Sequence, residues 1–317
     1  LAHRADRSLM AAPATAALPA PYGELCRQLG AFLPAERLIT DPLRRLAWGT
    51  DASFYRLVPE LVVVVESEDE VRRVLECCAR LATPVTFRAA GTSLSGQALS
   101  DSVLVLLGDG WRRVQVADDA QTITLQPGVI GAAANRALAP RGRKIGPDPA
   151  SIDTAMIGGI AANNASGMCC GTAQNSYRTL AAMRVVLADG AVLDTSDPAS
   201  VAAFRDSHAD LLSALGALAR ETNGNRVLAD RIRHKFRIKN TTGYTMQACP
   251  DAGTPVEILR RRMVGSEGTL GVVTRAILRL VPAQQPRSTV VATFPTVAAA
   301  AAAVIELGRT VRASMVE

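Results

Sequence analysis

Residues 88–97 combine the small and hydroxyl-bearing residue types that bind phosphate groups. They read RAAGTSLSGQ and directly follow a strand-like run at residues 84–87. Small residues let the backbone approach a ligand closely, while main-chain N–H groups and the hydroxyls of Thr92, Ser93 and Ser95 are neutral hydrogen-bond donors. The pattern predicts a loop that binds a dinucleotide cofactor. The alternative is an ordinary surface turn, in which the same residue types are common.

Two further side-chain-poor segments favour the cofactor interpretation. Residues 146–151 read GPDPAS, and residues 158–167 read GGIAANNASG. The chain contains neither a P-loop nor the G-x-G-x-x-G fingerprint of nicotinamide-binding domains. The nearest approach to that fingerprint is GSEGTLG at residues 265–271, which has the wrong spacing and leads into β-branched residues instead of a helix.

Composition places the chain among globular proteins and excludes several other classes. Its 317 residues are 48% hydrophobic and 20% charged, so the chain is long enough for two domains with a large core. The six cysteines form no C-x-x-C pair, and we therefore expect no metal or iron–sulfur site in it. Aromatic residues make up only 4%, and no nucleic-acid-binding motif occurs, which argues against a nucleic-acid partner.

The distribution of basic residues and of apolar residues indicates which ligands the protein could attract and whether it could span a membrane. The net charge of +6 is partly concentrated at residues 226–239 and 260–262. The favoured interpretation is a solvated helical face, and the alternative is attraction of an anionic ligand. No run of 18 or more apolar residues occurs, so no transmembrane segment is expected. We expect a cytoplasmic protein, with peripheral association at the inner membrane face as the alternative.

The sequence around the first loop predicts strands and a helix that place the loop at the end of a strand. Residues 61–65 and 84–88 have the apolar, β-branched composition of strands. Between them, Ser67 is a helix N-cap, and the apolar residues that follow it fall on one helical face: Val71, Val74, Leu75, Cys78 and Leu81. This order predicts a βαβ unit with its ligand site at the carboxyl end of the second strand.

The rest of the chain predicts hairpins, helices and a new unit near its end. The expected elements are a helical lead-in at 22–33, a strand at 103–107, a hairpin of 114–116 with 122–126, a helix at 128–138, a hairpin of 183–188 with 191–195, a helix over 211–219 that stops at Asn223 and Gly224, and a strand at 271–280. A strand at 288–294 and a helix at 296–308 would then begin a further βα unit. We therefore expect the chain to be part of a longer protein.

Taken together, these motifs and QPGV at residues 126–129 resemble the FAD-binding domain of the vanillyl-alcohol oxidase / p-cresol methylhydroxylase (PCMH) flavoprotein superfamily. Within it, NNASGMCCGT at residues 163–172 and KNTTGY at residues 239–244 are similar to the FAD-linked D-lactate and D-2-hydroxyglutarate dehydrogenases. Longer members of that group carry a C-terminal iron–sulfur half. The resemblance covers roughly residues 50 to 283, in order.

The resemblance implies an α+β fold, in which a PCMH-type FAD-binding domain of two α/β subdomains precedes the start of a truncated α+β cap domain. The implied boundaries are a tail and helical lead-in at 1–50, the FAD-binding domain at 51–283, and the start of the substrate or cap domain at 284–317. The loop at 88–97 would bind the pyrophosphate, residues 158–171 would lie near the flavin and its ribityl chain, and residues 267–273 would line the adenosine end.

The cofactor-binding residues that the resemblance implies are Arg88, Ala90, Gly91, Thr92, Ser93, Leu94, Gly96, Gln97, Pro147, Asp148, Ser151, Gly158, Gly159, Asn163, Ser166, Gly167, Gly171, Glu267, Gly271, Val272 and Val273. Glycine at 158, 159 and 167 fits this role, because a side chain there would hold the backbone away from the cofactor. For Glu267 the alternative is a carboxylate that caps a helix or a turn.

The implied reaction is FAD-dependent oxidation of a D-2-hydroxy acid, D-lactate or D-2-hydroxyglutarate, to the 2-oxo acid by hydride transfer to flavin N5. FAD is expected to bind non-covalently, because His3, His208 and His234 all lie outside the cofactor motifs. The family places its histidine base in the cap domain, so the catalytic residues are expected beyond Glu317. Cys169 and Cys170 are interpreted as packing residues, with a redox or attachment pair as the alternative.

Two other functions stay open, and the electron acceptor is not predicted. One is a different FAD-linked oxidase or reductase of the same superfamily, since members differ mainly in the cap. The other is a non-catalytic module that binds anionic nucleotides through the same loops.

Overall fold

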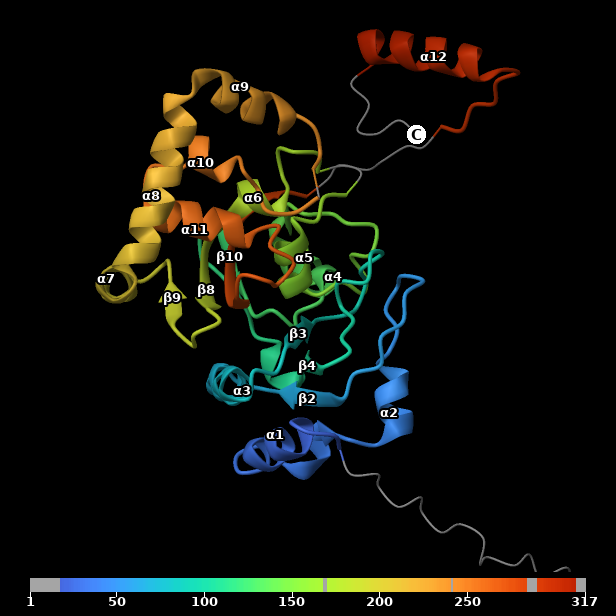
Figure 1. Ribbon diagram of the computed structural model, residues 1–317. Helices are drawn as coiled ribbons and strands as arrows, with labels where there is room; N and C mark the ends of the chain where they lie inside the picture. The colour runs from blue at the N-terminus through green and yellow to red at the C-terminus, as the bar shows by residue number, and fades with distance from the viewer. Residues whose placement is uncertain (1–17, 168–169, 241, 284–289, 312–317) are drawn as a thin grey trace, which may run out of the picture.

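The structure is a computed structural model that describes residues 18–167, 170–240, 242–283 and 290–311. Two β-sheets, each covered by helices, make up the described part of the chain, which confirms the expected α+β class (Figure 1). Within these residues, no helix combines the length and the apolar composition needed to cross a membrane.

The first sheet has four strands in the order β1-β2-β4-β3. Its strands are β1 (Leu38–Ile39), β2 (Leu61–Val65), β3 (Val85–Arg88) and β4 (Val103–Leu107). Both β2 and β3 run parallel to β4, which lies between them, so the predicted βαβ unit is present with a third strand inserted. The apolar β-branched run LVVVV in β2 is almost entirely buried, as a strand covered on both faces requires.

The helices of this first unit pack on its sheet. The helix α3 (Glu68–Arg80) begins at the predicted cap, where the Ser67 hydroxyl accepts a hydrogen bond from the Glu70 N–H. Val71 and Val74 of α3 share one core cluster with Leu25 of α1 (Tyr22–Leu29). The helical lead-in is therefore part of this unit. The short helix α2 (Pro42–Ala47) precedes an exposed segment at residues 51–58.

The second sheet is antiparallel and is built around one long strand. Its path is β5 (Val114–Val116), β6 (Thr122–Leu125), β10 (Val272–Pro282), β8 (Leu180–Val186) and β9 (Val192–Asp194), and β7 (Arg143–Ile145) pairs with the end of β10. In β10, Thr274, Ala276, Leu278 and Leu280 are buried at every second position, the pattern of a strand with one face on the core. Both predicted hairpins are confirmed.

Helices cover the second sheet and form the larger of the hydrophobic cores. They are α4 (Gly131–Leu138), α5 (Ile157–Asn163), α6 (Ser176–Thr179), α7 (Pro198–Ser207), α8 (Ala209–Gly224), α9 (Arg226–Lys235), α10 (Ala248–Asp251) and α11 (Pro255–Met263). The predicted leucine-rich helix is α8, and it ends at Gly224 as expected. Asn225 then caps α9 by accepting a hydrogen bond from the Leu228 N–H.

The last described segment confirms one prediction and contradicts another. The predicted helix at 296–308 is α12 (Val297–Thr310), capped by Thr296, and in Figure 1 it stands apart from the two sheets. The predicted strand at 288–294 is wrong for residues 290–294, which form no strand, while residues 288 and 289 lie outside the described residues. A strand needs a partner for its backbone hydrogen bonds, and within the described residues this segment pairs with no sheet.

Candidate functional site

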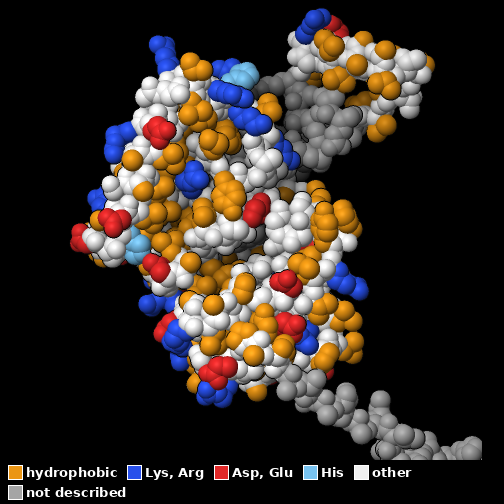
Figure 2. Space-filling model, viewed as in Figure 1, with side chains coloured by type: hydrophobic (Ala, Val, Ile, Leu, Met, Phe, Trp, Pro, Cys, Tyr) orange, Lys and Arg blue, Asp and Glu red, His pale blue; other side chains and the backbone are white. Residues whose placement is uncertain are grey.

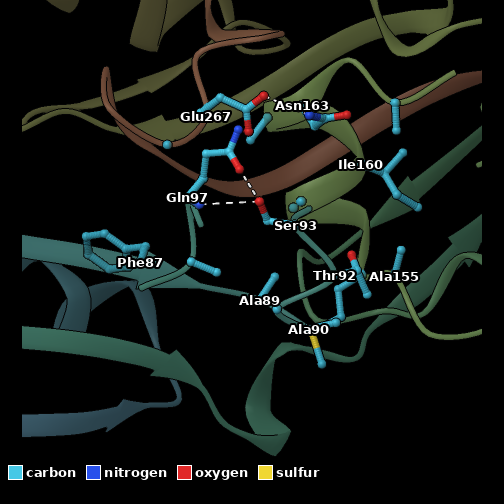
Figure 3. Close-up of a pocket in the computed structure, with 18 of the residues that line it drawn as sticks. Phe87, Ala89, Ala90, Thr92, Ser93, Gln97, Ala155, Ile160, Asn163 and Glu267 are labelled. Carbon is cyan, nitrogen blue, oxygen red and sulfur yellow. Dashed lines mark hydrogen bonds between the residues drawn. The ribbon is translucent and has the colours of Figure 1, made fainter. Parts of the chain in front are cut away.

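A cavity of about 450 Å³ lies between the two sheet units. Segments that are far apart in sequence line it: residues 87–98 at the end of β3, residues 149–165 including α5, and residues 267–273 leading into β10 (Figure 3). The cavity is therefore at the carboxyl end of β3, where the sequence places a ligand site. Its size is in the range of small-molecule and cofactor pockets.

The loop after β3 presents backbone donors to this cavity. Among the described residues, the N–H groups of residues 90–94 have no hydrogen-bond partner. Gly91 adopts a φ of +70°, which is costly for residues with a side chain and orients the following N–H groups. Ser93 holds the loop in shape, because its hydroxyl accepts hydrogen bonds from the Ser95 N–H at 3.2 Å and the Gln97 N–H at 3.3 Å.

The glycines of α5 and the segment after it have different roles. A Cβ on Gly158 would lie 2.9 Å from Cβ of Pro127, and one on Gly167 would lie 1.2 Å from the carbonyl oxygen of Asp148. Contacts within the chain therefore require both glycines, in addition to any role beside the cofactor, and Gly158 also lines the cavity. A Cβ on Gly159 would have one ordinary contact, 3.7 Å from Cβ of Ala89.

Glu267 and Asn163 form a hydrogen-bonded pair on the cavity wall. Asn163 Nδ2 donates to Glu267 Oε1 at 2.7 Å, and Figure 3 shows the two side chains pointing toward one another. Burial raises the pKa of Glu267, although the hydrogen bond from Asn163 opposes this effect. The Glu267 side chain thus bonds to another side chain, and no backbone N–H in the described residues donates to it, as a turn-capping carboxylate would require.

The structure brings many of the predicted residues to the wall of one cavity, and the others do not line it. The predicted residues that line the cavity are Ala90, Gly91, Thr92, Ser93, Leu94, Gln97, Ser151, Gly158, Gly159, Asn163, Glu267, Gly271, Val272 and Val273. Those that do not line it are Arg88, Gly96, Pro147, Asp148, Ser166, Gly167 and Gly171. Most of the second group are sequence neighbours of lining residues.

Sequence reasoning missed the apolar part of the lining. Lining residues that were not named individually but lie inside the segments assigned to the cofactor are Ala89, Ser95, Pro127, Pro149, Ile160, Ala162, Ala165 and Gly268. Those that lie outside these segments are Phe87, Ala98, Leu107, Ala155 and Met156. Pro127 lies in the QPGV motif and Ser95 in the first loop, so a signal existed for both. Small apolar residues such as Ala155 have no chemistry that distinguishes a cavity wall from a core position.

The basic runs do not reach the cavity. Lys and Arg side chains gather on the surface over α9, in agreement with the favoured interpretation of a solvated face (Figure 2). In α11, Arg260 donates to the carbonyl oxygen of Leu180, and Arg261 pairs with Glu257 at 2.6 Å. These arginines stabilise their own surroundings and do not line the cavity, so direct contact with a ligand bound there is not expected of them.

The histidines and cysteines that are described also lie outside the cavity lining. His208 bonds to Asp189 at 2.9 Å and stacks on Phe204, so it connects α7 to the β8–β9 hairpin. The Cys170 sulfur is buried and accepts a hydrogen bond from the Gly167 N–H at 3.1 Å, whereas Cys169 lies outside the described residues. No group of three or more His, Cys, Asp or Glu among the described residues could hold a metal ion.

Comparison with known proteins identifies the domain. Residues 59–196 match the family model described as an FAD binding domain. The chain carries an FAD-binding domain of the PCMH-type superfamily. The cavity offers groups that suit this cofactor: the unpartnered N–H groups of residues 90–94 can bind its phosphates, and the glycine-rich start of α5 lines the same cavity.

Relatives of this FAD-binding domain include enzymes named for 2-hydroxy acids. The chain is 29% identical to the glycolate oxidase subunit GlcD of Bacillus subtilis, over 83% of this chain and 46% of the relative. It is 26% identical to the D-2-hydroxyglutarate dehydrogenase of Pantoea ananatis, over 78% of this chain and 25% of the relative. It is 27% identical to the D-lactate dehydrogenase of Archaeoglobus fulgidus, over 78% and 45%.

Solved structures share the fold of this chain. An alkyldihydroxyacetonephosphate synthase superposes with a TM-score of 0.58 at 19% identity, over 92% of this chain and 47% of that chain. A variant of Phl p 4, titled a glucose oxidase, superposes with a TM-score of 0.54 at 13% identity. The chain spans less than half the length of these curated relatives and structures.

Proposed function

We propose that the protein to which this chain belongs oxidises a small 2-hydroxy acid to the 2-oxo acid, with this chain supplying the FAD-binding part. The observation that carries the proposal is the cavity lined by residues 87–98, 149–165 and 267–273, of which the first two segments lie within the matched residues 59–196. The substrate class is supported by the names of the relatives, since glycolate, D-lactate and D-2-hydroxyglutarate all carry a hydroxyl on the carbon next to a carboxylate.

The residues that would hold FAD follow from the chemistry of the lining. The N–H groups of residues 90–94 and the Thr92 hydroxyl are suited to the pyrophosphate, because they are neutral donors on a closely approachable backbone. The short side chains of α5 leave room for the flatter part of the cofactor, and residues 267–273 would contact the adenosine end. Because no histidine lines the cavity in the described residues, we propose non-covalent binding.

The roles of the chain in the reaction are binding, orientation and exclusion of water. When bound, FAD supplies a two-electron acceptor for the α-hydrogen and its electron pair. Phe87, Met156 and Ile160 give the cavity an apolar wall, which keeps water from the buried part of the cofactor. Glu267 is the only titratable side chain among the described lining residues, and the base that takes the hydroxyl proton stays unassigned.

Two measurements test the proposal. The purified chain is titrated with FAD while flavin fluorescence is followed, and saturable binding is expected. The protein at its natural length is then mixed without oxygen with glycolate, D-lactate, L-lactate or D-2-hydroxyglutarate. At least one of these acids is expected to bleach the visible flavin band. FAD binding without bleaching by any acid would point to a different reaction of the superfamily, and failure to bind FAD would leave only a nucleotide-binding module.

A further inference from the structure

Arg88 is the last residue of β3, and its side chain lies behind the cofactor loop. It is only 9% exposed. Its Nη1 donates to the carbonyl oxygen of Thr50 at 2.7 Å and to that of Trp48 at 3.4 Å, while Nε is buried without a partner. The guanidinium thus holds the segment at residues 48–50, and part of its hydrogen-bonding capacity is unused.

The same guanidinium lies directly against the loop. A Cβ on Gly91 would be 2.4 Å from Nη2 of Arg88, so the glycine backbone covers the cation. The Gly91 carbonyl oxygen accepts a hydrogen bond from the Ala52 N–H at 3.0 Å, which ties the loop to the same segment that Arg88 holds. Gly91 also lines the cavity. One layer of backbone therefore separates the Arg88 charge from the cavity.

A cation close to the site would add to the stabilisation of a bound pyrophosphate. Among the described residues that line the cavity, Glu267 is the only ionisable one, and none is basic. The pyrophosphate of FAD is a dianion, and a positive charge behind the neutral donors would attract it further. Arg88 keeps its charge at neutral pH, although burial lowers its pKa and nearby Asp51 raises it. The hydrogen bonds that Arg88 donates go to backbone carbonyl oxygens, and in the described residues no carboxylate pairs with it, so its charge is available.

We propose that Arg88 is a positioning residue for the pyrophosphate: it holds the loop at Gly91, and its charge offsets the pyrophosphate through the loop backbone. The proposal rests on the binding of FAD in this cavity. It goes beyond FAD binding, because it assigns Arg88 a role toward the phosphates of the cofactor and none toward its flavin part. It predicts that the charge of Arg88 matters for FAD and not for riboflavin, which has no phosphate.

Arg260 is a matched control within the same chain. It too is a poorly exposed arginine that donates to a backbone carbonyl oxygen, that of Leu180, and whose pKa burial lowers; unlike Arg88, it also lies 3.5 Å from a carboxylate, that of Glu257. It does not line the cavity or contact the loop. An arginine that only stabilises the fold should behave as Arg260 does.

The test compares the dissociation constants of FAD and riboflavin in Arg88→Met, Arg88→Lys and Arg260→Met. We expect Arg88→Met to weaken FAD binding on the order of tenfold to a hundredfold and to change riboflavin binding less than about threefold. Arg88→Lys, which keeps the charge, should retain most of the preference for FAD. Arg260→Met should leave that preference unchanged. Equal losses for both ligands, or an equal loss in Arg88→Lys and Arg88→Met, would overturn the proposal.

A second measurement covers the case in which Arg88→Met does not fold or riboflavin binds too weakly. The ³¹P resonances of FAD bound to the unsubstituted chain, to Arg88→Lys and to Arg260→Met are compared. Arg88→Lys moves the cation relative to the phosphates, so a shift is expected there and not in Arg260→Met. Identical ³¹P spectra in all three proteins contradict the proposal. Absence of FAD binding in the unsubstituted chain would instead contradict the function on which it rests.

Discussion

Glu68 in the first turn of α3 and Arg184 in β8 form a two-point ion pair that joins the two sheet units. Arg184 Nη2 lies 2.8 Å from Glu68 Oε1, and Nε donates to Oε2 at 2.8 Å. The Thr274 hydroxyl of β10 donates to the same carboxylate at 2.7 Å. The cavity has one wall in each unit, so this pair helps to set the distance between its walls.

Replacing Glu68 should therefore destabilise the fold. We expect Glu68→Gln to lower the free energy of unfolding by about 1 to 2 kcal/mol. The ion pair is partly buried, and the substitution leaves Arg184 without its main partner. Urea denaturation measures the change. Glu24→Gln is the control, since Glu24 pairs with Arg27 on an exposed helix surface, where ion pairs contribute little. Equal stability of Glu68→Gln and the unsubstituted chain would contradict this role.

The same pair predicts how stability depends on pH. Burial alone would raise the pKa of Glu68, but hydrogen bonds from Arg184 and Thr274 bring it below its usual value of 4.5. A carboxyl whose pKa is lowered by folding stabilises the protein above its unfolded pKa, and this stability is lost as the pH falls through the folded pKa. The deficit of Glu68→Gln relative to the unsubstituted chain should thus be full at pH 7 and shrink below about pH 4.5. Unfolding curves of both proteins at pH 7 and at several pH values below 4.5 measure this change in the deficit. A deficit that stays constant over this range would refute the linkage.

Glu267 predicts the opposite pH dependence. Burial raises its pKa, with Asn163 opposing, so folding favours the protonated form. The FAD-free protein should therefore lose stability as the pH rises from the unfolded pKa of Glu267 through its folded pKa. Glu267→Gln keeps an oxygen acceptor for Asn163 and removes the charge, so it should be at least as stable as the unsubstituted chain at pH 7. Melting temperatures at pH 4 and pH 7 test this, and a marked destabilisation of Glu267→Gln at pH 7 would contradict it.

Gly167 and Gly159 should respond differently to alanine. Gly167→Ala is expected to destabilise the fold by about 3 kcal/mol or more, because its Cβ would overlap the carbonyl oxygen of Asp148. Gly159→Ala should keep or raise the melting temperature, since alanine favours a helix and its Cβ meets only Ala89. The same Cβ borders the cavity, so FAD binding to Gly159→Ala should weaken. Similar melting temperatures for the two variants would show that a Cβ is tolerated equally at positions 159 and 167, against this prediction.

The elements that sequence reasoning predicted are those with a strong local pattern. β2 is an unbroken apolar β-branched run, and α3 has a serine cap followed by helical periodicity, so both could be placed to within a residue or two. The strand expected over residues 290–294 has a similar local composition but no partner in the described residues, so it does not form there. Strand formation depends on pairing, which a local window does not contain.

By itself, the sequence determined the class of the fold, the three glycine-rich segments and the neutral-donor character of the loop at residues 90–94, because each depends on residue types that are adjacent in the chain. Only the tertiary structure decided which side of the loop each residue takes. It places Arg88 behind Gly91, packs Gly167 against Asp148 and pairs Glu267 with Asn163. The last two contacts join residues that are far apart in sequence, and the Arg88 side chain is held by carbonyl oxygens of Trp48 and Thr50, so none of the three could be read from a local stretch of residues.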